Sequence, residues 1–235
     1  MNMLNSVMGI KDIRENQNSI FYLLDREEKQ ELERHISLAH YKKNEFVFKE
    51  GDTPNGLMML VNGKVKIYKE GVAGREQIIR MARPLGMIGY RALFAGGNHI
   101  ATAVTIEESL VCTISTEFIL DVALKNNLFC QKIIVLLATE LGFAHARTVA
   151  LTQKHIRGRL AESLMLLINK YGYEHDGTTL KVYLSREDIA NLSNMTTSNA
   201  IRTLSTFANE KIISIDGRKI KILDAQKLDR VSKLG

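Results

Sequence analysis

Side chains that can hydrogen-bond to the edges of DNA bases are gathered in one short segment near the C-terminus. Arginine can donate two hydrogen bonds to guanine, asparagine can pair with adenine, and serine or threonine can contact several bases. Such side chains read a DNA sequence when they stand on the N-terminal part of a helix in the major groove. The candidates for base contacts in this sequence are Thr197, Ser198, Asn199 and Arg202.

The residues around this run predict the elements that would hold it. A short strand is expected at Leu180–Leu184, and Ser185 and Asp188 then have the spacing of a capping box, which starts a helix. Asn194 adopts the left-handed conformation more readily than most residues, so it suits a tight turn. Thr196 would cap a second helix. The residues expected on the inner side of that helix are Ala200, Ile201, Leu204 and Phe207.

A basic hairpin is expected to follow the second helix. The run Ile213–Ile222 has Asp216 and Gly217 at its centre, which favours a two-residue turn. Helix, tight turn, helix and basic hairpin are, in this order, typical of a winged helix-turn-helix. Residues 150–235 hold 14 basic and 9 acidic side chains, whereas residues 1–149 hold 18 and 17, so the excess positive charge lies where DNA phosphates would bind. The residues expected to contact the DNA backbone are Ser185, Arg186, Thr196, Lys211, Arg218, Lys219 and Lys221.

A long helical segment runs from about Glu117 to beyond Leu151, and one of its faces repeats every seven residues. A narrow seam sustained over three heptads is typical of two helices that pack along each other. The alternative is an amphipathic helix packed on its own domain, which tolerates a broader apolar face. We favour a parallel contact between two copies of the chain, through Cys130, Ile134, Leu137, Leu141, Ala144, Thr148 and Leu151.

The segment Tyr41–Ser115 has short apolar runs separated by glycines, which is typical of an antiparallel roll or barrel. Its strongest local signal is Asn62-Gly63, which predicts a type I′ hairpin turn. The charged stretch Asp25–His40 before it is expected to be helical. The predicted fold class is α+β: an N-terminal antiparallel β-roll (a double-stranded jelly roll), a long dimerisation helix and a C-terminal winged helix-turn-helix. The expected domain ranges are 1–125, 126–153 and 154–235.

The composition excludes several other classes of protein. Two cysteines, Cys112 and Cys130, cannot form a disulfide framework, a four-thiolate zinc site or an all-cysteine iron–sulfur cluster. The segment Tyr41–Ser115 holds a single histidine, so it cannot supply a metal triad, and without a catalytic motif we do not expect an enzyme. The longest run without Asp, Glu, Lys or Arg, Ala92–Ile106, is too short and too polar to cross a membrane. No secretory signal is readable, so we expect a cytoplasmic protein that does not bind membranes.

Six short motifs carry a further resemblance: Phe48-Lys-Glu-Gly-Asp52, Leu60-Val-Asn-Gly-Lys-Val65, Gly74-Arg-Glu-Gln-Ile-Ile79, Gly86-Met-Ile-Gly89, Gly158-Arg-Leu-Ala-Glu-Ser-Leu164 and Leu184-Ser-Arg-Glu-Asp-Ile-Ala190. In order and spacing they are similar to the Crp/Fnr family of bacterial transcription regulators, over about Leu32 to Leu223. The resemblance implies an effector-binding roll, a dimerising helix and a winged helix-turn-helix that reads a two-fold symmetric DNA site. It also implies RNA polymerase as a partner.

The family's pocket for cyclic nucleotides is altered in this sequence. In the family, a carboxylate beside the second glycine holds the ribose, and an Arg-Ser or Arg-Ala pair holds the cyclic phosphate. Tyr90 stands at the first position, and Ile100 and Ala101 stand at the pair, so the charge-assisted contacts to phosphate are missing. Cyclic AMP is therefore not expected, and the effector stays unidentified. The residues expected to line the pocket are Met87, Ile88, Gly89, Tyr90, Arg91, Leu93, His99, Ile100, Ala101, Leu141, Ala144 and His145.

Two histidines in this pocket leave a second kind of sensor open. His99 and His145 are candidates for an axial haem ligand, although a polar lining of an apolar pocket is the commoner role of such residues. The main prediction is an effector-responsive, DNA-binding regulator that acts as a homodimer. The alternatives are a constitutive regulator with a purely structural roll and a haem-based gas sensor.

Overall fold

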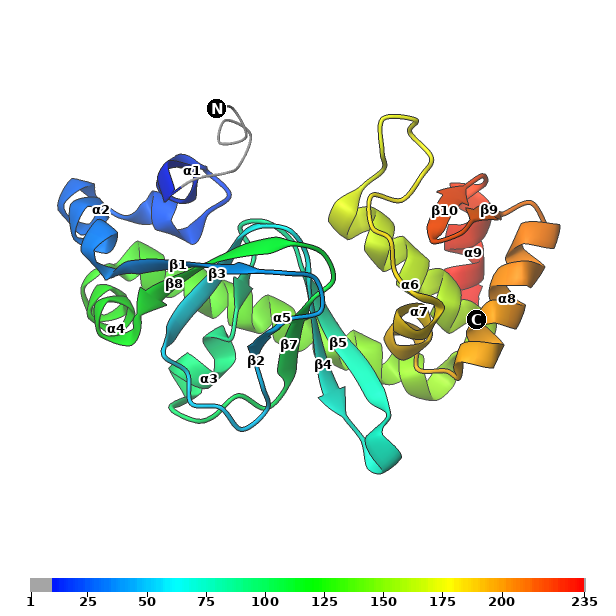
Figure 1. Cartoon of the computed structure of the whole chain (residues 1–235), viewed down its shortest axis with the longest axis horizontal. Helices are drawn as coiled ribbons and strands as arrows, with labels where there is room; N and C mark the ends of the chain where they lie inside the picture. The colour runs from blue at the N-terminus through cyan, green and yellow to red at the C-terminus, as the bar shows by residue number, and fades with distance from the viewer. Residues whose placement is uncertain (1–9, 235) are drawn as a thin grey trace. The chain divides into compact units, whose positions relative to one another are not determined.

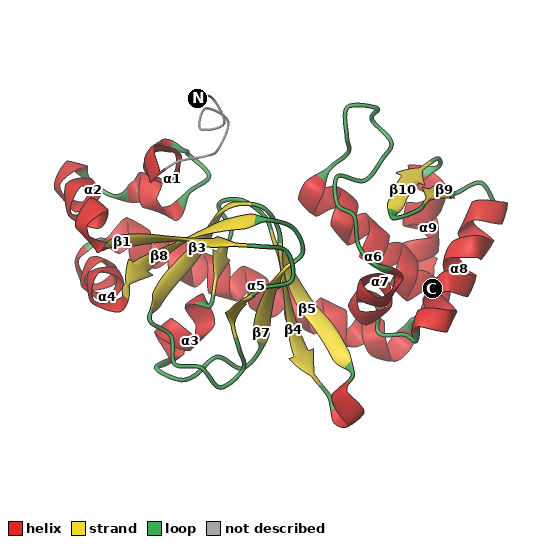
Figure 2. Cartoon of the chain, viewed as in Figure 1, coloured by secondary structure: helices red, strands yellow, loops and turns green. Residues whose placement is uncertain are grey.

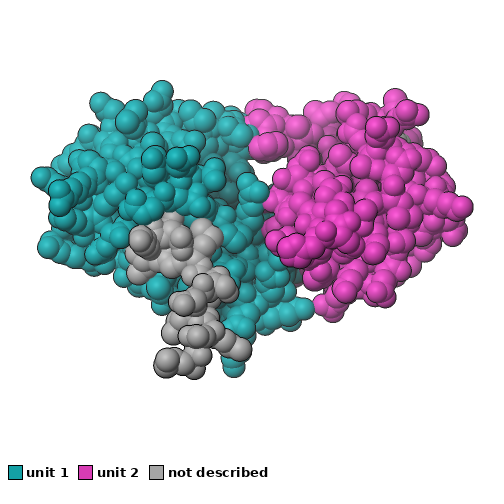
Figure 3. Space-filling view, turned by 90° about the horizontal axis from the view of Figure 1, so that it is seen from above, with its two compact units in different colours: residues 1–69, 79–141 teal, residues 70–78, 142–235 magenta. Residues whose placement is uncertain are grey.

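The structure is a computed structural model that describes residues 10–234. These residues form two compact units, which Figure 3 colours separately. The first unit contains the chain up to Lys69 together with Ile79–Leu141. The second contains Glu70–Ile78 together with the chain from Gly142 onward. The long helix α5 (Asn127–Gln153) continues from the first unit into the second.

Within the described residues, two four-stranded sheets form the β-roll (Figures 1 and 2). One sheet has the strand order β1-β8-β3-β6, and the other has the order β2-β7-β4-β5. Strand β8 pairs antiparallel with β1 and with β3, and β7 pairs antiparallel with β2 and with β4, which confirms the expected antiparallel roll. The strands are β1 (Ile36–Tyr41), β2 (Phe46–Phe48), β3 (Gly56–Asn62), β4 (Val65–Glu70), β5 (Glu76–Ala82), β6 (Met87–Ile88), β7 (Thr102–Thr105) and β8 (Ser109–Ser115).

Two clusters of buried side chains hold the roll together, and β3 contributes to both. Leu57 and Met59 belong to the first cluster, whereas Met58 and Leu60 belong to the second, because successive side chains of a strand point to opposite faces. The first cluster also contains Phe129 of α5, so this helix packs on the roll. The helices that flank the strands are α1 (Ile10–Glu15), α2 (Arg26–Leu32), α3 (Tyr90–Ala95) and α4 (Thr116–Lys125), with 3-10 turns at Ile20–Leu23, Glu33–His35 and Val72–Gly74.

Two local predictions for the first unit are wrong. The stretch Asp25–His40 is not one helix, because its second half forms β1, which pairs with β8 along its whole length. Asn62 and Gly63 do not close a hairpin, because β3 and β4 lie in different sheets. A type I′ turn needs a positive φ at both residues, and of these two only Gly63 has one, at +91°. The connection therefore carries the chain from one sheet to the other.

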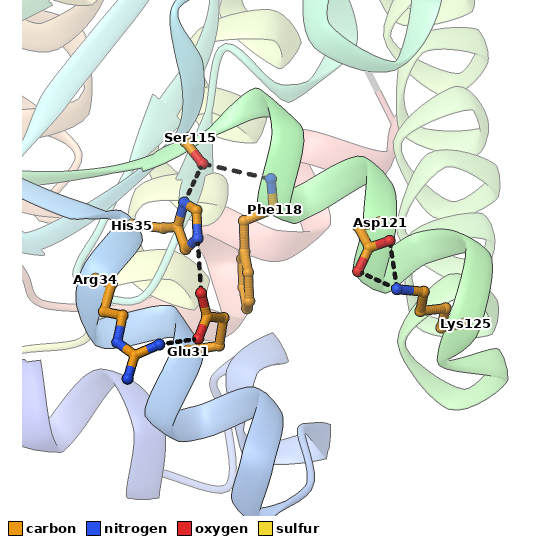
Figure 4. A network of polar contacts seen from close by, with 7 residues as sticks. All are labelled: Glu31, Arg34, His35, Ser115, Phe118, Asp121 and Lys125. Atoms are coloured by element: carbon orange, nitrogen blue, oxygen red, sulfur yellow. Dashed lines mark hydrogen bonds and ion pairs between the residues drawn. The ribbon is translucent and has the colours of Figure 1, made fainter.

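A polar network ties the residues before β1 to the start of α4 (Figure 4). In His35, Nδ1 lies 2.9 Å from Ser115 Oγ and Nε2 lies 3.3 Å from Glu31 Oε1, and the ring stacks on Phe118. A serine, a histidine and a glutamate in contact can serve nucleophilic catalysis. Here, however, Ser115 Oγ accepts a hydrogen bond from the backbone N–H of Phe118 and caps α4. The network therefore holds a helix end in place.

The second unit contains the predicted winged helix-turn-helix. The capping box of Ser185 and Asp188 is present, and Asn194 is left-handed, with φ 50° and ψ 58°. Thr196 Oγ1 accepts a hydrogen bond from the backbone N–H of Asn199 at 3.3 Å, as expected for a helix cap. The elements are α6 (Ile156–Tyr171), α7 (Arg186–Ser193), α8 (Thr197–Asn209), β9 (Ile213–Asp216), β10 (Lys219–Ile222) and α9 (Ala225–Leu234).

Two details of this unit differ from the prediction. Leu180–Leu184 forms no regular strand: Leu180 makes an isolated β-bridge with Tyr173, and Thr179, just before the range, makes one with Lys221. The turn of the hairpin, or wing, lies one residue later than expected. Asp216 pairs with Lys219, so the loop begins at Gly217, which has a φ of +55°. A glycine at the first loop position is what a type II′ turn requires.

Candidate DNA-reading surface and effector region

Helix α8 carries the four predicted base-contacting residues on its first two turns, and Thr196, which was expected to contact the DNA backbone, caps the helix. Thr196, at the cap, and Thr197, Ser198 and Arg202 are exposed, and Asn199 is half-buried. The opposite face of the helix is buried by Ala200, Thr203, Leu204 and Phe207. A ligand that approaches the exposed face of the helix can therefore contact these polar side chains.

Ile201 is an exception to the predicted pattern of this helix. It was expected on the inner side, but its side chain is 47% exposed. Each residue of an α-helix advances about 100° around the axis, so Ile201 lies well away from its buried neighbour Ala200. It stands on the exposed face between Thr197 and Ser198, which are four and three positions before it.

Basic residues of the wing are also exposed. Arg218 and Lys219 lie at the wing, and Lys211 lies at the turn after α8, where it adopts a positive φ of 57°. Lys221 is exposed as well, but its Nζ lies 3.3 Å from a carboxylate oxygen of Asp176. The positive charges expected to face DNA phosphates are therefore at the surface.

Two other predicted DNA contacts already have partners within the chain. Arg186 Nη2 donates a hydrogen bond to Gly217 O at 2.7 Å, so this side chain holds the wing turn against the start of α7. Ser185 Oγ accepts from the backbone N–H of Asp188 at 2.9 Å and donates to Asp188 Oδ2 at 2.7 Å. Both residues position elements of the candidate DNA-reading surface.

The C-terminal end of α8 is fixed by an arginine that the sequence reasoning missed. Arg157 Nη1 donates to Glu210 Oε1 at 2.8 Å, and its guanidinium lies 4.8 Å from the ring centroid of Phe207. This pair holds the pKa of the Glu210 carboxyl below its usual range, chiefly through the hydrogen bond from Arg157. No short-range sequence signal could link residues so far apart along the chain.

A second missed arginine binds the end of α7. Arg147 Nη2 donates to Ile78 O at 2.7 Å and to Leu192 O at 2.6 Å, and Gln77 Nε2 donates to Asn191 O at 2.7 Å. The last carbonyl groups of a helix lack partners within the helix, so these donors satisfy them. Burial lowers the pKa of Arg147. The two side chains thereby fasten the first helix of the helix-turn-helix to α5 and to the segment before Ile79.

Helix α5 has one buried face and one uncovered face. Phe129 and Ile133 are buried in the first cluster, and Leu136 packs against it. The predicted seam lies on a different face. Its residues Ile134 and Leu141 are 60% and 57% exposed. Among the remaining seam residues, Leu137, Ala144 and Thr148 are exposed, and Cys130 and Leu151 are half-buried. Within the described chain, this apolar seam is left without a cover.

The predicted effector-pocket residues divide between the two clusters of the roll. Met87, Tyr90 and Leu93 belong to the first cluster, with Phe129 of α5. Ile88 and Ala101 belong to the second, and Gly89 lies between Ile88 of the second cluster and Tyr90 of the first. Arg91 and Ile100 are exposed, as are Leu141, Ala144 and His145 on α5, of which Ala144 and His145 belong to the second unit.

An arginine, a tyrosine and a glutamate that contact one another link the roll to α5. Arg80 Nη1 donates to Met87 O at 2.8 Å, its guanidinium lies 5.0 Å from the ring centroid of Tyr90, and its Nε lies 3.4 Å from Glu140 Oε1. Burial raises the pKa of the Tyr90 hydroxyl, and Glu140, which accepts a hydrogen bond from it, raises it further against the opposing effect of Arg80. Tyr90 is among the residues predicted to line the pocket, but the sequence gives no sign of its two charged partners.

His99 is enclosed in the second cluster. Its ring stacks on Phe48 with centroids 3.8 Å apart, and its Cε1 lies 2.8 Å from where a Cβ on Gly89 would be. Burial lowers the pKa of His99, while the Asp52 carboxylate opposes this shift. Gly89, with a φ of +73°, is therefore the residue that lets the histidine pack so closely.

Two family models match this chain. The cyclic nucleotide-binding domain matches residues 38–126, and the Crp-like helix-turn-helix domain matches residues 158–231. The chain belongs to the Crp/Fnr family of transcription regulators. The two matched ranges correspond to the roll and to the winged helix-turn-helix described above.

Known members of the Crp/Fnr family resemble this chain over most of their length. The CRP-like cAMP-activated global transcriptional regulator of Mycobacterium tuberculosis is 24% identical over 200 residues, which are 85% of this chain and 89% of the relative. The Fumarate and nitrate reduction regulatory protein of Vibrio cholerae is 28% identical over 188 residues, 80% of this chain and 75% of the relative. The structure of FixK2 from Bradyrhizobium japonicum has a TM-score of 0.76 at 23% identity and covers 83% of this chain and 96% of its own.

Membership of the Crp/Fnr family makes this chain a DNA-binding transcription regulator and not an enzyme, as the sequence predicted. In residues 10–234 no group of three or more His, Cys, Asp or Glu side chains is placed to hold a metal ion. Helix α5 is long and apolar enough, by length and composition alone, to cross a membrane. Crp/Fnr regulators are soluble, so the apolar surface of α5 is to be explained by contacts other than lipid.

Proposed function

We propose that this Crp/Fnr regulator acts in the cytoplasm as a homodimer, binds a two-fold symmetric DNA site and responds to an effector other than cyclic AMP. The observation that carries the proposal is the seam of α5, which is apolar, repeats every seven residues and has no cover within the described chain. An uncovered apolar face of this length is unfavourable in water. The proposal gives that face a partner.

A second copy of the same chain fits the seam better than an unrelated partner. Identical parallel helices bring equal positions together, so one heptad pattern supplies both sides of the contact. Ala144 and Thr148 are small enough to allow the two backbones to approach. The dimer would present two copies of α8, and two half-sites one helical turn apart, about 34 Å, would receive them.

The surroundings of Tyr90 support an effector other than cyclic AMP. Tyr90 is buried at the position of the family's ribose-binding carboxylate, and Ile100 and Ala101 bring no positive charge to the position of the phosphate. Arg91 is exposed, and the guanidinium of Arg80 is already engaged by a carbonyl and a carboxylate. A cyclic phosphate bound here would lack the charge-assisted contacts on which its binding depends.

The same proposal assigns tasks to the parts of the chain. Residues 1–125 would sense the effector, residues 126–153 would dimerise, and residues 154–235 would bind DNA. RNA polymerase is the further partner proposed from the family resemblance, with the loop Gly172–Thr178 as its contact.

The test combines the mass of the purified full-length protein with its DNA binding. Native mass spectrometry is expected to give twice the chain mass, and selection from random DNA duplexes is expected to give a palindromic site. Leu141→Lys on the seam should yield a monomer with strongly reduced affinity for that site. Val135→Lys is the matched control, because Val135 is 51% exposed on another face of α5, and this variant should stay dimeric. A monomeric wild type, or a Leu141→Lys variant that dimerises normally, would contradict the proposal.

The effector part is tested in the same preparation. Addition of cyclic AMP is expected to leave DNA affinity unchanged, and the absorption spectrum is expected to show no haem band. A cyclic AMP response would contradict the assignment made from Tyr90 and Ile100. A haem band in protein from its own host would instead support the gas-sensor alternative, and His99→Ala and His145→Ala would then identify the ligand.

A further inference from the structure

Ile201 is an aliphatic side chain in the middle of the candidate DNA-reading surface. Its side chain is 47% exposed, and the exposed residues beside it on α8 are Thr197, Ser198 and Arg202. Scattered apolar residues are normal on protein surfaces and need no explanation by themselves. Ile201 differs in that the residues around it are the ones that would enter the major groove.

The hydrogen bonds of the next helical turn leave Ile201 and Arg202 as the outward-reaching side chains of this part of α8. Ser205 Oγ donates to Ile201 O at 3.0 Å, and Thr206 Oγ1 donates to Arg202 O at 3.1 Å. Both hydroxyl groups are therefore turned back onto the helix. Isoleucine is branched at Cβ and has one strongly preferred rotamer in a helix, so little conformational entropy is lost when it is held in a groove.

The chemistry of the major groove selects the group that an isoleucine can recognise. Guanine, adenine and cytosine present only hydrogen-bonding groups there, whereas thymine also presents its C5 methyl group. Isoleucine has no donor or acceptor, so against a polar base edge it would displace water without replacing the lost hydrogen bonds. Against the methyl group of thymine it would remove apolar surface of both partners from water.

We infer that Ile201 reads the C5 methyl group of a thymine in the same half-site in which Arg202 contacts its base. The inference rests on the proposed DNA-reading role of α8 and adds a base-specific contact to it. It requires no movement of the helix, because the side chain is already exposed between the polar candidates.

The experiment replaces thymine by deoxyuridine, which lacks only the methyl group. The full-length chain first selects its binding site from random duplexes, and each thymine of that site is then replaced in turn. In each half-site, removing the methyl group of one thymine is expected to lower the affinity of the chain for the DNA about fourfold. This is the effect of one buried methyl or methylene group. This part of the test uses the wild-type chain, so it does not depend on the folding of any variant.

Variants then assign the methyl contact to its residue. Ile201→Ala should abolish the difference between thymine and deoxyuridine at that position, and Ile201→Val should retain part of it. Ile156→Ala is the matched control, because Ile156 is 38% exposed on α6 and lies outside α8, and it should keep the full difference.

The unfavourable outcomes are distinct from one another. If no thymine is sensitive to loss of its methyl group, or if Ile201→Ala keeps the wild-type sensitivity, the inference is wrong while sequence-specific binding stands. If the full chain selects no site at all, the proposed function itself is contradicted, and the inference fails with it.

Discussion

Replacement of Gly63 by alanine is expected to destabilise the roll strongly, and the chain offers a matched control. Gly63 and Gly51 both have a φ of +91°, a conformation that costs an alanine about 1–2 kcal/mol. A Cβ on Gly51 would meet nothing within 4 Å, whereas a Cβ on Gly63 would lie 2.2 Å from Ser109 Oγ, 2.6 Å from Glu108 O and 2.7 Å from Ser109 Cα. Only the first of these atoms belongs to a side chain that can turn away.

The two variants therefore separate backbone strain from steric overlap. Gly51→Ala should cost about 1–2 kcal/mol, and Gly63→Ala about 2–5 kcal/mol, because overpacking against backbone atoms adds about 1–3 kcal/mol to the same strain. For a chain of this size each kcal/mol lowers the melting temperature by about 2–4 °C. Differential scanning calorimetry of the two purified variants measures the difference. Equal melting temperatures for Gly63→Ala and Gly51→Ala would refute the reasoning.

Three further predictions concern buried and hydrogen-bonded groups. Arg147→Met should reduce the free energy of unfolding by about 3 kcal/mol in denaturant titrations, since two charge-assisted hydrogen bonds are lost; Arg91→Met, at an exposed position, should have little effect. Burial raises the pKa of Cys112 to about 12, so at pH 8 the thiol stays protonated, and native Cys130→Ser protein should react with no thiol reagent until it is unfolded. Hydrogen bonds from Thr179 and the backbone hold the pKa of Asp176 well below its usual range. The stability that this carboxylate contributes is therefore present above about pH 4 and lost as the pH falls further. The difference in melting temperature between wild type and Asp176→Asn should accordingly shrink between pH 6 and pH 2. A difference that stays constant over this range would argue against the assigned role of Asp176.

The elements that were predicted correctly are those whose signals lie within a few residues. The capping box of Ser185 and Asp188, the left-handed Asn194 and the cap at Thr196 each depend on local hydrogen bonds, so the spacing of residue types is enough to find them. The helix α5 follows from the spacing of its apolar residues in the same way, whereas the contact between two copies along its seam stays a prediction. With these elements in place, the residues of the candidate DNA-reading surface could be named before the fold was known.

The predictions that failed depend on partners distant in sequence. Strand β1 lies in a stretch whose local pattern predicts a helix, but its pairing with β8 decides its conformation, and nothing near β1 indicates that pairing. Asn62-Gly63 has the composition of a hairpin turn, but the two strands that it joins pair with other strands. Arg147 and Arg157 could not be assigned, because their partners are backbone carbonyls and a carboxylate from elsewhere in the chain. Ile201 was misplaced because an apolar residue was assumed to be buried.

Because α5 uses two different faces, one packed on the roll and one forming the seam, its function depends on the number of its residues as well as on their types. Ile133 packs on the roll and its neighbour Ile134 lies on the seam, so the two faces are about 100° apart around the helix axis. Insertion or deletion of one residue between Ile134 and Leu141 would rotate the later seam residues by that angle around the helix axis. They would then no longer lie on the same face as the earlier seam residues. A partner chain would then meet only half of its contacts. Homologues that keep this mode of association should therefore vary in composition along α5 but not in length.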